Sequence, residues 1–263
     1  MKLFLVLILC ALAAAAPRSQ KQDVLQFDMS AADINNNPEQ RNILLNALIR
    51  QLIAYVRRVI NNGSVIFGFP PLDPLVVEEY HLYIPAGLIN LDMKLRDILI
   101  TGFGGFEVPK SELDLRSMTF DLDIVFPHLD IVAGEYDLVG DLYNAIPLYG
   151  KGPARFVIEN FRVSAILHLK QSEDGASVLL DRISGASFAI PSFKCDINGV
   201  IGGGDIDAIV NAITEEVLIG YVNRFQGAIS FIVSTLGVDI ANPFLDQLNT
   251  WRYIAPFIPR NSD

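Results

Sequence analysis

The stretch from Asp205 to Leu236 reads DIDAIVNAITEEVLIGYVNRFQGAISFIVSTL and decides the fold. Glycines 202–204 break the chain before it, and Asp205 is a favourable N-cap. Gly237 and Pro243 then predict an end at Leu236, so the helix would be about 46 Å long at 1.5 Å per residue. Its large apolar residues recur every three or four positions, which is helical spacing: Ile206, Val210, Ile213, Val217, Tyr221, Phe225, Ile229, Ile232 and Leu236.

Polar residues change side along this predicted helix. One group comes early and comprises Asp207, Asn211 and Glu215, and another comes later and comprises Asn223, Gln226 and Ser230. A buried stripe that turns around the axis suits a coiled cover wound about the helix, or a bend near Gly220.

The chain between Val76 and about Lys194 supplies such a cover, because apolar and polar residues alternate there with the period of β-strands. Short turns with Gly or Pro favour antiparallel pairing. Phase slips after Asp97, Leu115 and Ile158 indicate β-bulges, which bend a sheet. The predicted strands are 77–84, 88–100, 113–126, 129–139, 155–170 and 177–184.

A second, amphipathic helix is predicted from Pro38 to the Asn61-Asn62-Gly63 stop. It would pack on the fold or lie on a membrane, and packing on the fold is the favoured interpretation. The order of helix, antiparallel meander and long helix predicts an α+β fold, with residues 17–263 as one domain.

Residues 1–16 have the pattern of a secretory signal peptide, with Lys2 before an apolar run and small residues at its end. We therefore expect an extracellular protein. No other segment is expected to insert stably into a membrane, because the C-terminal helix carries Glu215, Glu216 and Arg224. The formal net charge of −10 argues against nucleic acid and anionic membranes as partners.

Cysteine use also fits an exported protein that depends on its core. Once the leader is removed, Cys195 stands alone and no intramolecular disulfide can form. We expect it to be a small buried hydrophobe in preference to a reactive thiol. Asn62-Gly63-Ser64 is an acceptor triplet for N-glycosylation at Asn62.

No recognisable catalytic set, cofactor motif or metal-ligand spacing occurs, so we expect a non-enzymatic protein without cofactor or metal. G-x-S-x-G is missing, and the glycine clusters at 102–105 and 202–204 lack the remainder of a phosphate loop. Asp121 and Asp123 share a strand face, where a solvated edge is favoured over an acid/base pair. The histidines lack metal-ligand spacing: His81, His128 and His168.

Apolar surface beyond the needs of a core, without catalytic residues, indicates a carrier of a small hydrophobic ligand. Gly220 and Gly227 leave room for a close strand or a ligand, and Arg224 would either extend to solvent or meet a polar head group. For each predicted contact residue, plain core packing is the alternative. The predicted ligand-binding residues are Phe120, Leu122, Ile124, Val163, Leu167, Val217, Gly220, Tyr221, Arg224 and Phe225.

Two segments are similar to motifs of the insect takeout and haemolymph juvenile-hormone-binding family. One is Phe69-Pro70-Pro71-Leu72-Asp73-Pro74-Leu75, and the other runs from Tyr136-Asp137-Leu138-Val139-Gly140 through Ile146-Pro147-Leu148-Tyr149-Gly150-Lys151-Gly152-Pro153. The resemblance covers most of residues 36–250. It implies a long helix wrapped by a curved sheet, as in tubular lipid-binding proteins, and a hydrophobic tunnel for a terpenoid, fatty acid or similar lipid.

Mite group 7 allergens and bactericidal/permeability-increasing proteins resemble the chain more distantly. The N-terminal cysteine pair usual in the family is missing, so the lipid-carrier class is carried over and juvenile hormone itself is not. An interaction or immune-recognition protein is the alternative, binding microbial lipid or a receptor through an apolar tip near Phe244 or residues 251–258. A hormone-modifying esterase is disfavoured.

Overall fold

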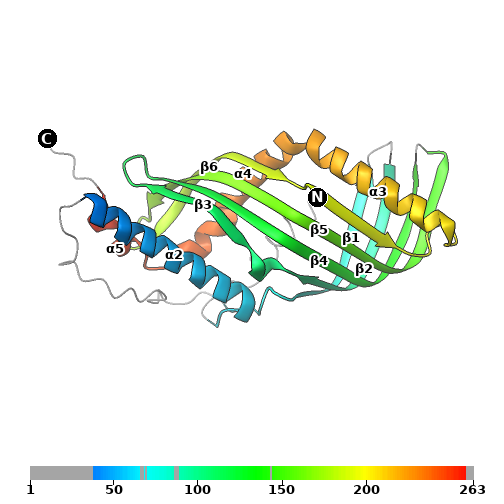
Figure 1. Ribbon diagram of the computed structural model, residues 1–263, viewed down its shortest axis with the longest axis horizontal. Helices are drawn as coiled ribbons and strands as arrows, with labels where there is room; N and C mark the ends of the chain where they lie inside the picture. The colour runs from blue at the N-terminus through cyan, green and yellow to red at the C-terminus, as the bar shows by residue number, and fades with distance from the viewer. Residues whose placement is uncertain (1–37, 66–67, 69, 86–88, 143, 259–263) are drawn as a thin grey trace.

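The computed structural model describes residues 38–65, 68, 70–85, 89–142 and 144–258 (Figure 1). The predicted signal peptide and Cys10 lie outside the described residues. The elements are α2 (Pro38–Asn62), β1 (Leu75–Pro85), β2 (Ile89–Thr101), η2 (Phe103–Gly105), β3 (Glu107–Asp114), β4 (Thr119–Leu142), β5 (Ile146–Gln171), β6 (Val178–Ala189), β7 (Ser192–Ile197), α3 (Asp205–Arg224), α4 (Gln226–Leu245), α5 (Trp251–Ile254) and η3 (Ala255–Phe257).

The strands form one antiparallel sheet in the order β1-β2-β4-β5-β6, with β3 paired to β4 and β7 paired to β5. This confirms the α+β fold with a long curved sheet (Figure 1). Two strand predictions were wrong in their bounds, since 113–126 and 129–139 belong mostly to the single 24-residue β4. The slip after Leu115 is the turn of the β3–β4 hairpin, where Met118 has a φ of 52°, and β7 was not predicted.

The slips after Asp97 and Ile158 are confirmed as local irregularities, because Asp97 and Asn160 have φ values of 51° and 55°. Leu95 and Ile98 are both buried although their spacing is odd, and their β4 partners Tyr136 and Ala133 are buried too. In the neighbouring strands β2 and β4, the alternation of buried and exposed residues therefore shifts at positions that lie side by side. Irregularities aligned in this way bend both strands at the same place.

Ion pairs cover the polar face of the sheet along β4 and β5. Carboxylates at Asp123, Asp130 and Asp137 pair with cations on β5: Arg162, Arg155 and Lys151. Asp121 pairs instead with Lys110 at 2.6 Å. The solvated-edge interpretation of the Asp121 and Asp123 pair was therefore wrong, and so was the acid/base one, because each carboxylate binds its own cation.

The predicted single C-terminal helix is two helices. Phe225, with φ −102° and ψ 13°, separates α3 from α4, and α4 continues to Leu245 with Pro243 in its last turn. The predicted end at Leu236 was wrong, and the bend predicted near Gly220 corresponds to an interruption five residues further on, at Phe225. Gly237 is not a cap: it lies inside α4, where an added Cβ would be 2.9 Å from Ile183 Cδ1. Its lack of a side chain leaves room for the end of the Ile183 side chain.

Polar side chains dock the two helices on the free edges of β7 and β6. Asn211 Oδ1 accepts a hydrogen bond from the N–H of Ile197 at 2.9 Å, and Glu215 Oε1 accepts one from Cys195 at 2.8 Å. Asp207 accepts from Gly199 and Val200 in the same way. The early polar group thus covers a strand edge, which would otherwise offer unpaired N–H groups.

The apolar stripe of α3 is correspondingly less covered than its spacing predicts. Ile206, Ile213 and Val217 are 39%, 45% and 40% exposed. Val210 of the predicted stripe contacts the main hydrophobic cluster, together with Leu218 and Val222, which were not part of the stripe. The helix is therefore oriented by its polar edge contacts, and periodicity identified its buried face only in part.

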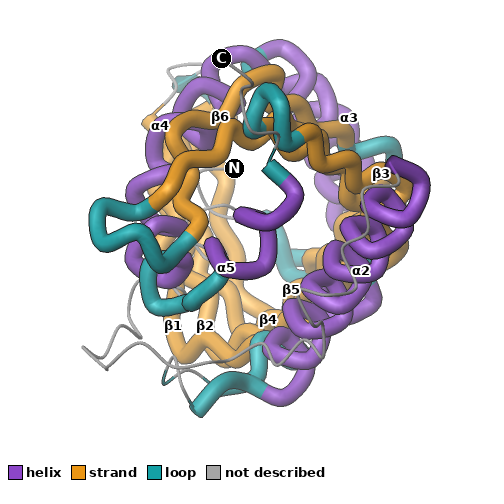
Figure 2. Tube along the Cα trace, turned by 90° about the vertical axis from the view of Figure 1, so that its left-hand side faces the viewer, coloured by secondary structure: helices purple, strands orange, loops and turns teal. Residues whose placement is uncertain are grey.

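Two hydrophobic clusters lie at different parts of the sheet. The main one includes Leu95, Leu129 and Tyr136, and the second contains Leu48, Leu115, Ile254 and Phe257. The second joins α2, the β3–β4 turn and the C-terminal segment, so α2 packs on the fold as predicted. Viewed along the molecule, the sheet and helices α2, α3 and α4 form a ring, with α5 in front of it (Figure 2).

Candidate ligand-binding site

The five ligand-binding residues predicted on the sheet lie on one face of two paired strands. Phe120 is opposite Leu167, Ile124 is opposite Val163, and Leu122 is opposite Ala165. Residues directly opposite in an antiparallel pair have adjacent side chains on the same face. The structure therefore brings Phe120, Leu122, Ile124, Val163 and Leu167 into one apolar surface.

This apolar surface is only half-buried, which distinguishes it from the rest of the sheet face. Along β4, Leu129 and Ala133 have no exposed surface, whereas the three predicted residues of β4 are intermediate in exposure. The half-buried segment lies between the main hydrophobic cluster and the second cluster at the β3–β4 turn. The apolar side chains between the two clusters are thus accessible to solvent or to a bound ligand.

An aromatic cluster bounds this surface next to Asn160, where the backbone of β5 is irregular. The rings of Phe126 and Phe161 stack with centroids 5.9 Å apart, and Phe103 meets Phe126 edge-on at 6.1 Å. Phe161 directly follows Asn160, whose left-handed conformation turns the strand. The phase change on β5 therefore places Phe161 on the apolar face beside Phe126.

Helix α3, which carries four of the five predicted helix residues, packs mainly on another part of the sheet. Helix α3 packs on β7, which pairs with residues 154–159 of β5, whereas α4 packs on β6, which pairs with Val163 and Leu167. Val217 and Phe225 are 40% and 41% exposed, and Arg224 is exposed. An added Cβ on Gly220 or Gly227 would meet nothing within 4 Å. The side chain of Tyr221 lies outside the described residues.

Sequence analysis missed α4 as the helix nearest the apolar surface. Gln226 and Asn242 bind β6 through their amides: Gln226 donates to the carbonyl of Phe188, and Asn242 pairs with Leu180. Their spacing is not a whole number of helical turns, so no periodic pattern marks these contacts in the sequence. The predicted end at Leu236 also placed Asn242 outside the helix.

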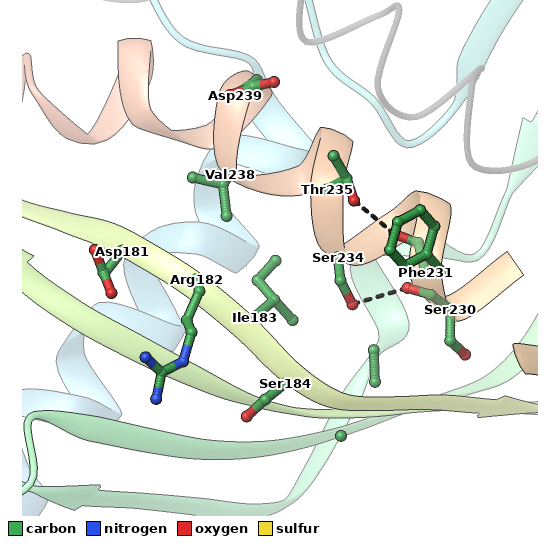
Figure 3. Close-up of a pocket in the computed structure, with 12 residues that line it drawn as sticks. Asp181, Arg182, Ile183, Ser184, Ser230, Phe231, Ser234, Thr235, Val238 and Asp239 are labelled. Atoms are coloured by element: carbon green, nitrogen blue, oxygen red, sulfur yellow. Dashed lines mark hydrogen bonds between the residues drawn. The ribbon is translucent and has the colours of Figure 1, made fainter. Parts of the chain in front are cut away.

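A groove of about 600 Å³ runs between α4 and β6 (Figure 3). Ile183 of β6 and the side chains of Ser234 and Val238 of α4 point toward one another across it. Ile183 is opposite Leu167 in the sheet, so the groove adjoins the half-buried apolar surface. The lining residues are Asp181, Arg182, Ile183, Ser184, Gly185, Ala186, Ser230, Phe231, Ser234, Thr235, Val238 and Asp239.

The motif around Tyr136 holds the fold together. Tyr136 is fully buried and its hydroxyl donates to the carbonyl of Asn198 at 2.8 Å, and burial raises the pKa of this tyrosine to about 12. An added Cβ on Gly150 would lie 2.7 Å from that hydroxyl, and one on Gly152 would lie 2.6 Å from the Asn198 carbonyl oxygen. The glycines of this motif therefore make room for the tyrosine and the β7–α3 loop.

The proline-rich motif also has a structural role. Asp73 accepts hydrogen bonds from the N–H groups of Gly102 and Gly104 at 3.0 and 2.7 Å. Its own N–H and that of Leu72 donate to the carbonyl of Ile60. The motif thus ties the end of α2 to η2, and neither motif contributes one of the predicted ligand contacts.

Cys195 is a buried free thiol, and burial raises its pKa to about 12. It therefore stays protonated at neutral pH, which confirms its interpretation as a small hydrophobe. Asn62 is exposed and is the last residue of α2. Its position leaves the acceptor triplet accessible, and glycosylation itself stays a prediction.

By length and composition alone, α4 could cross a membrane, with no buried side chain in its most apolar window. The charges on which the opposite expectation rested, Glu215, Glu216 and Arg224, lie in α3 and not in α4, and the absence of stable membrane insertion stays a prediction. Helix α4 is bound to β6 by Gln226 and Asn242. These contacts favour its interpretation as a helix of the fold.

The fold and the half-buried surface define a class of α+β proteins in which a curved antiparallel sheet and helices surround an apolar face (Figure 2). A sequence model described as Haemolymph juvenile hormone binding protein (JHBP) matches residues 7–255, and the chain belongs to this family. The comparison with curated proteins gave no significant match.

Among solved structures, takeout 1 of Epiphyas postvittana is similar with a TM-score of 0.53 and 11% identity, covering 76% of this chain and 93% of that one. Lipopolysaccharide binding protein gives a TM-score of 0.38 at 13% identity, covering 77% of this chain and 39% of that one. Latherin gives 0.29 at 16% identity, covering 98% and 94%. The first likeness supports the fold, and the other two scores are too low to do so.

Proposed function

We propose that this protein is an exported carrier that binds a small hydrophobic ligand, such as a terpenoid or a fatty acid, on the apolar face of β4 and β5. The observation that carries the proposal is the half-buried surface of Phe120, Ile124 and Leu167 between two fully packed clusters. Membership of a family described by hormone binding supports a hydrophobic ligand. The predicted leader supports export.

Hydrophobic transfer would supply the affinity. Removing about 200 Å² of apolar surface from water is worth roughly 5 kcal/mol, before the cost of ordering the ligand. The surface offers no charged partner among the five sheet residues, which suits a hydrocarbon chain or ring. A carrier function needs no catalytic group, and we propose no catalysis.

Native mass spectrometry of the purified full chain tests this proposal directly. We expect a co-purified lipid of a few hundred daltons, together with displacement of a fluorescent fatty-acid probe by terpenoids and fatty acids. A chain that is free of lipid and never takes up the probe would overturn the carrier function.

A surface-recognition function is the second candidate, and the exposed stripe of α3 favours it. Ile209 is 59% exposed, and Ile206 and Ile213 lie on the same side of the helix. The apolar tip was predicted near Phe244 or residues 251–258, and the second location was wrong, because Ile254 and Phe257 are buried in the second cluster. Phe244 is only partly exposed. Binding of microbial-lipid vesicles that Ile209→Ser abolishes, with probe uptake unchanged, would support this function over the carrier.

A further inference from the structure

Helix α3 has a continuous exposed face on the side away from its contacts with the sheet. Ile209 and Ile213 each lie two residues, or about 200° around the helix, from Asn211, which binds the β7 edge. The exposed residues of this outer face are spaced alternately three and four apart along the whole helix: Ile206, Ile209, Ile213, Glu216, Gly220 and Asn223. This spacing is the heptad pattern of a helix that packs along a second helix.

The two ends of the outer face carry opposite charges. Asp205 is the first residue of α3 and Arg224 is its last, and both are exposed. A second α3 helix that lies antiparallel against the first would bring each Asp205 level with an Arg224. The outer face is therefore complementary in charge to the same face of a second copy related by a two-fold axis.

The heptad spacing gives the same register as these charges. When Asp205 is level with the second copy's Arg224, Ile206 is level with its Asn223 and Ile213 is level with its Glu216. Residues of the outer face then meet residues of the outer face along the whole length of both helices. A shift by a single residue would set them against residues that lie outside the face.

Gly220 completes the match at the most exposed isoleucine of the face. In this register Ile209, which is 59% exposed, is level with the second copy's Gly220. An added Cβ on Gly220 would meet nothing within 4 Å, so this position is an open gap on the helix surface. A large side chain opposite a missing one suits the packing of the knobs of one helix into the holes of another.

The charges on α3 favour a protein helix over a lipid surface as the partner. Glu216 lies within the outer face and Asp205 lies at its end, and both are exposed. Carboxylates oppose both entry into hydrocarbon and contact with anionic lipid, whereas an opposing helix offers Arg224 to Asp205. Two helices of 20 residues are about 30 Å long and would bury roughly 1,000 Å² in total, which is the lower end of specific interfaces. Such a contact should dissociate on dilution.

We infer that the outer face of α3 binds the same face of a second copy, which gives a two-fold dimer with antiparallel α3 helices. Ile209 of each copy packs on Gly220 of the other, and Asp205 pairs with Arg224 at both ends. The dimer does not depend on the carrier function. It covers the stripe to which the second candidate function assigns recognition.

Sedimentation equilibrium of the full chain, from low micromolar to several hundred micromolar, tests this dimer. We expect a monomer–dimer equilibrium whose Kd rises at least about tenfold in Ile209→Glu, because two carboxylates then enter the contact. Val139→Glu is the matched control, since Val139 of β4 is 63% exposed and lies far from α3 in the sequence, and it should leave the Kd unchanged. Neither variant replaces a buried side chain, so circular dichroism should show the native fold in both.

Two further variants test the register. Arg224→Glu should raise the Kd about threefold to tenfold, because it sets two carboxylates together at each end, and adding Asp205→Lys to the same chain should restore the native Kd. Glu216→Leu should lower the Kd at least about fivefold, because it puts an apolar side chain opposite Ile213 in place of a carboxylate.

Three results would overturn the inference. One is a native chain that stays monomeric over this range together with a monomeric Glu216→Leu variant. Another is a dimer whose Kd Ile209→Glu leaves unchanged, which would place the contact on another surface. The third is vesicle binding that Ile209→Ser abolishes in a chain that stays monomeric, which would assign the outer face to lipid recognition. Uptake of the fluorescent fatty-acid probe tests the carrier function separately.

Discussion

Asn242 binds Leu180 as a neighbouring β-strand would, with its side-chain amide accepting from the N–H at 2.8 Å and donating to the carbonyl at 2.9 Å. One side chain of a helix thus satisfies both free backbone groups of an edge-strand residue. Because Asn242 lies in the last turn of α4, this pair of hydrogen bonds fixes the C-terminal end of α4 to the sheet.

Replacing Asn242 should therefore weaken the attachment of the C-terminal end of α4 to β6. We expect Asn242→Ala to lower the free energy of unfolding by about 1–3 kcal/mol, because two hydrogen bonds are lost and Leu180 keeps unpaired groups. Asn242→Asp should also destabilise, since it loses the donor. Urea titration measures both, with Asn223→Ala at an exposed position of α3 as control. A loss no larger than that of the control would contradict the role of the pair.

Gly237 and Ile183 provide a packing test. Gly220→Ala should stabilise the protein by about 0.5–1 kcal/mol, because nothing lies within 4 Å of its added Cβ. Gly237→Ala should stabilise it less, because the new methyl group would lie 2.9 Å from Ile183 Cδ1, the end of a side chain that must then shift. With Ile183→Val, which removes that atom, the gain from Gly237→Ala relative to Ile183→Val alone should approach that of Gly220→Ala. Thermal unfolding followed by circular dichroism distinguishes the three.

The ion pair of Asp123 and Arg162 should make the stability of the fold depend on pH. Hydrogen bonds from Arg162 hold the pKa of the Asp123 carboxyl below its usual value. A lowered folded-state pKa stabilises the fold above the unfolded pKa of about 4, and this contribution is lost as pH falls through the folded value. Asp123→Asn should therefore lower the urea midpoint at pH 7, and its difference from the native chain should shrink below about pH 4. A difference that stays constant with pH would exclude the ion pair as its cause.

A larger side chain on β4 should occupy the space above the proposed ligand-binding surface. Leu122→Trp places a larger ring among Phe120, Ala165 and Leu167 and should abolish uptake of a fluorescent fatty-acid probe, or weaken it at least tenfold. Val139→Trp is the control on the opposite face of the same strand, where Val139 is 63% exposed, and should leave uptake unchanged. Unchanged uptake by Leu122→Trp with the native fold retained would place the ligand elsewhere.

Local patterns predicted the α+β fold because each reports a local preference. Alternation at Ile89, Leu91 and Met93 identified β2, and the odd spacing of Leu95 and Ile98 identified its irregularity. The slip after Leu115 could not be told from a bulge, since a tight hairpin also shifts the phase by an odd number of residues. Sequence pattern alone does not separate a bend within one strand from a turn between two.

The buried side of the helix that was expected to line the site could not be predicted from the sequence, for a different reason. Periodicity assigned Ile206, Ile213 and Val217 to the buried side of the helix, but Asn211 and Glu215 bind strand edges and rotate that side outward. A side-chain contact with a distant backbone leaves no periodic signal. The five sheet residues were grouped correctly on one face because strand alternation alone determines a sheet face.

The polar contacts of α3 have a consequence for how this chain behaves among copies of itself. The N–H groups of Cys195, Ile197 and Gly199 are those to which a strand from another molecule would add. Glu215, Asn211 and Asp207 occupy them, each from the next turn of one helix. The residues that position the helix therefore also block the addition of a further strand at the β7 edge, so the orientation of α3 and the protection of this edge depend on the same three side chains.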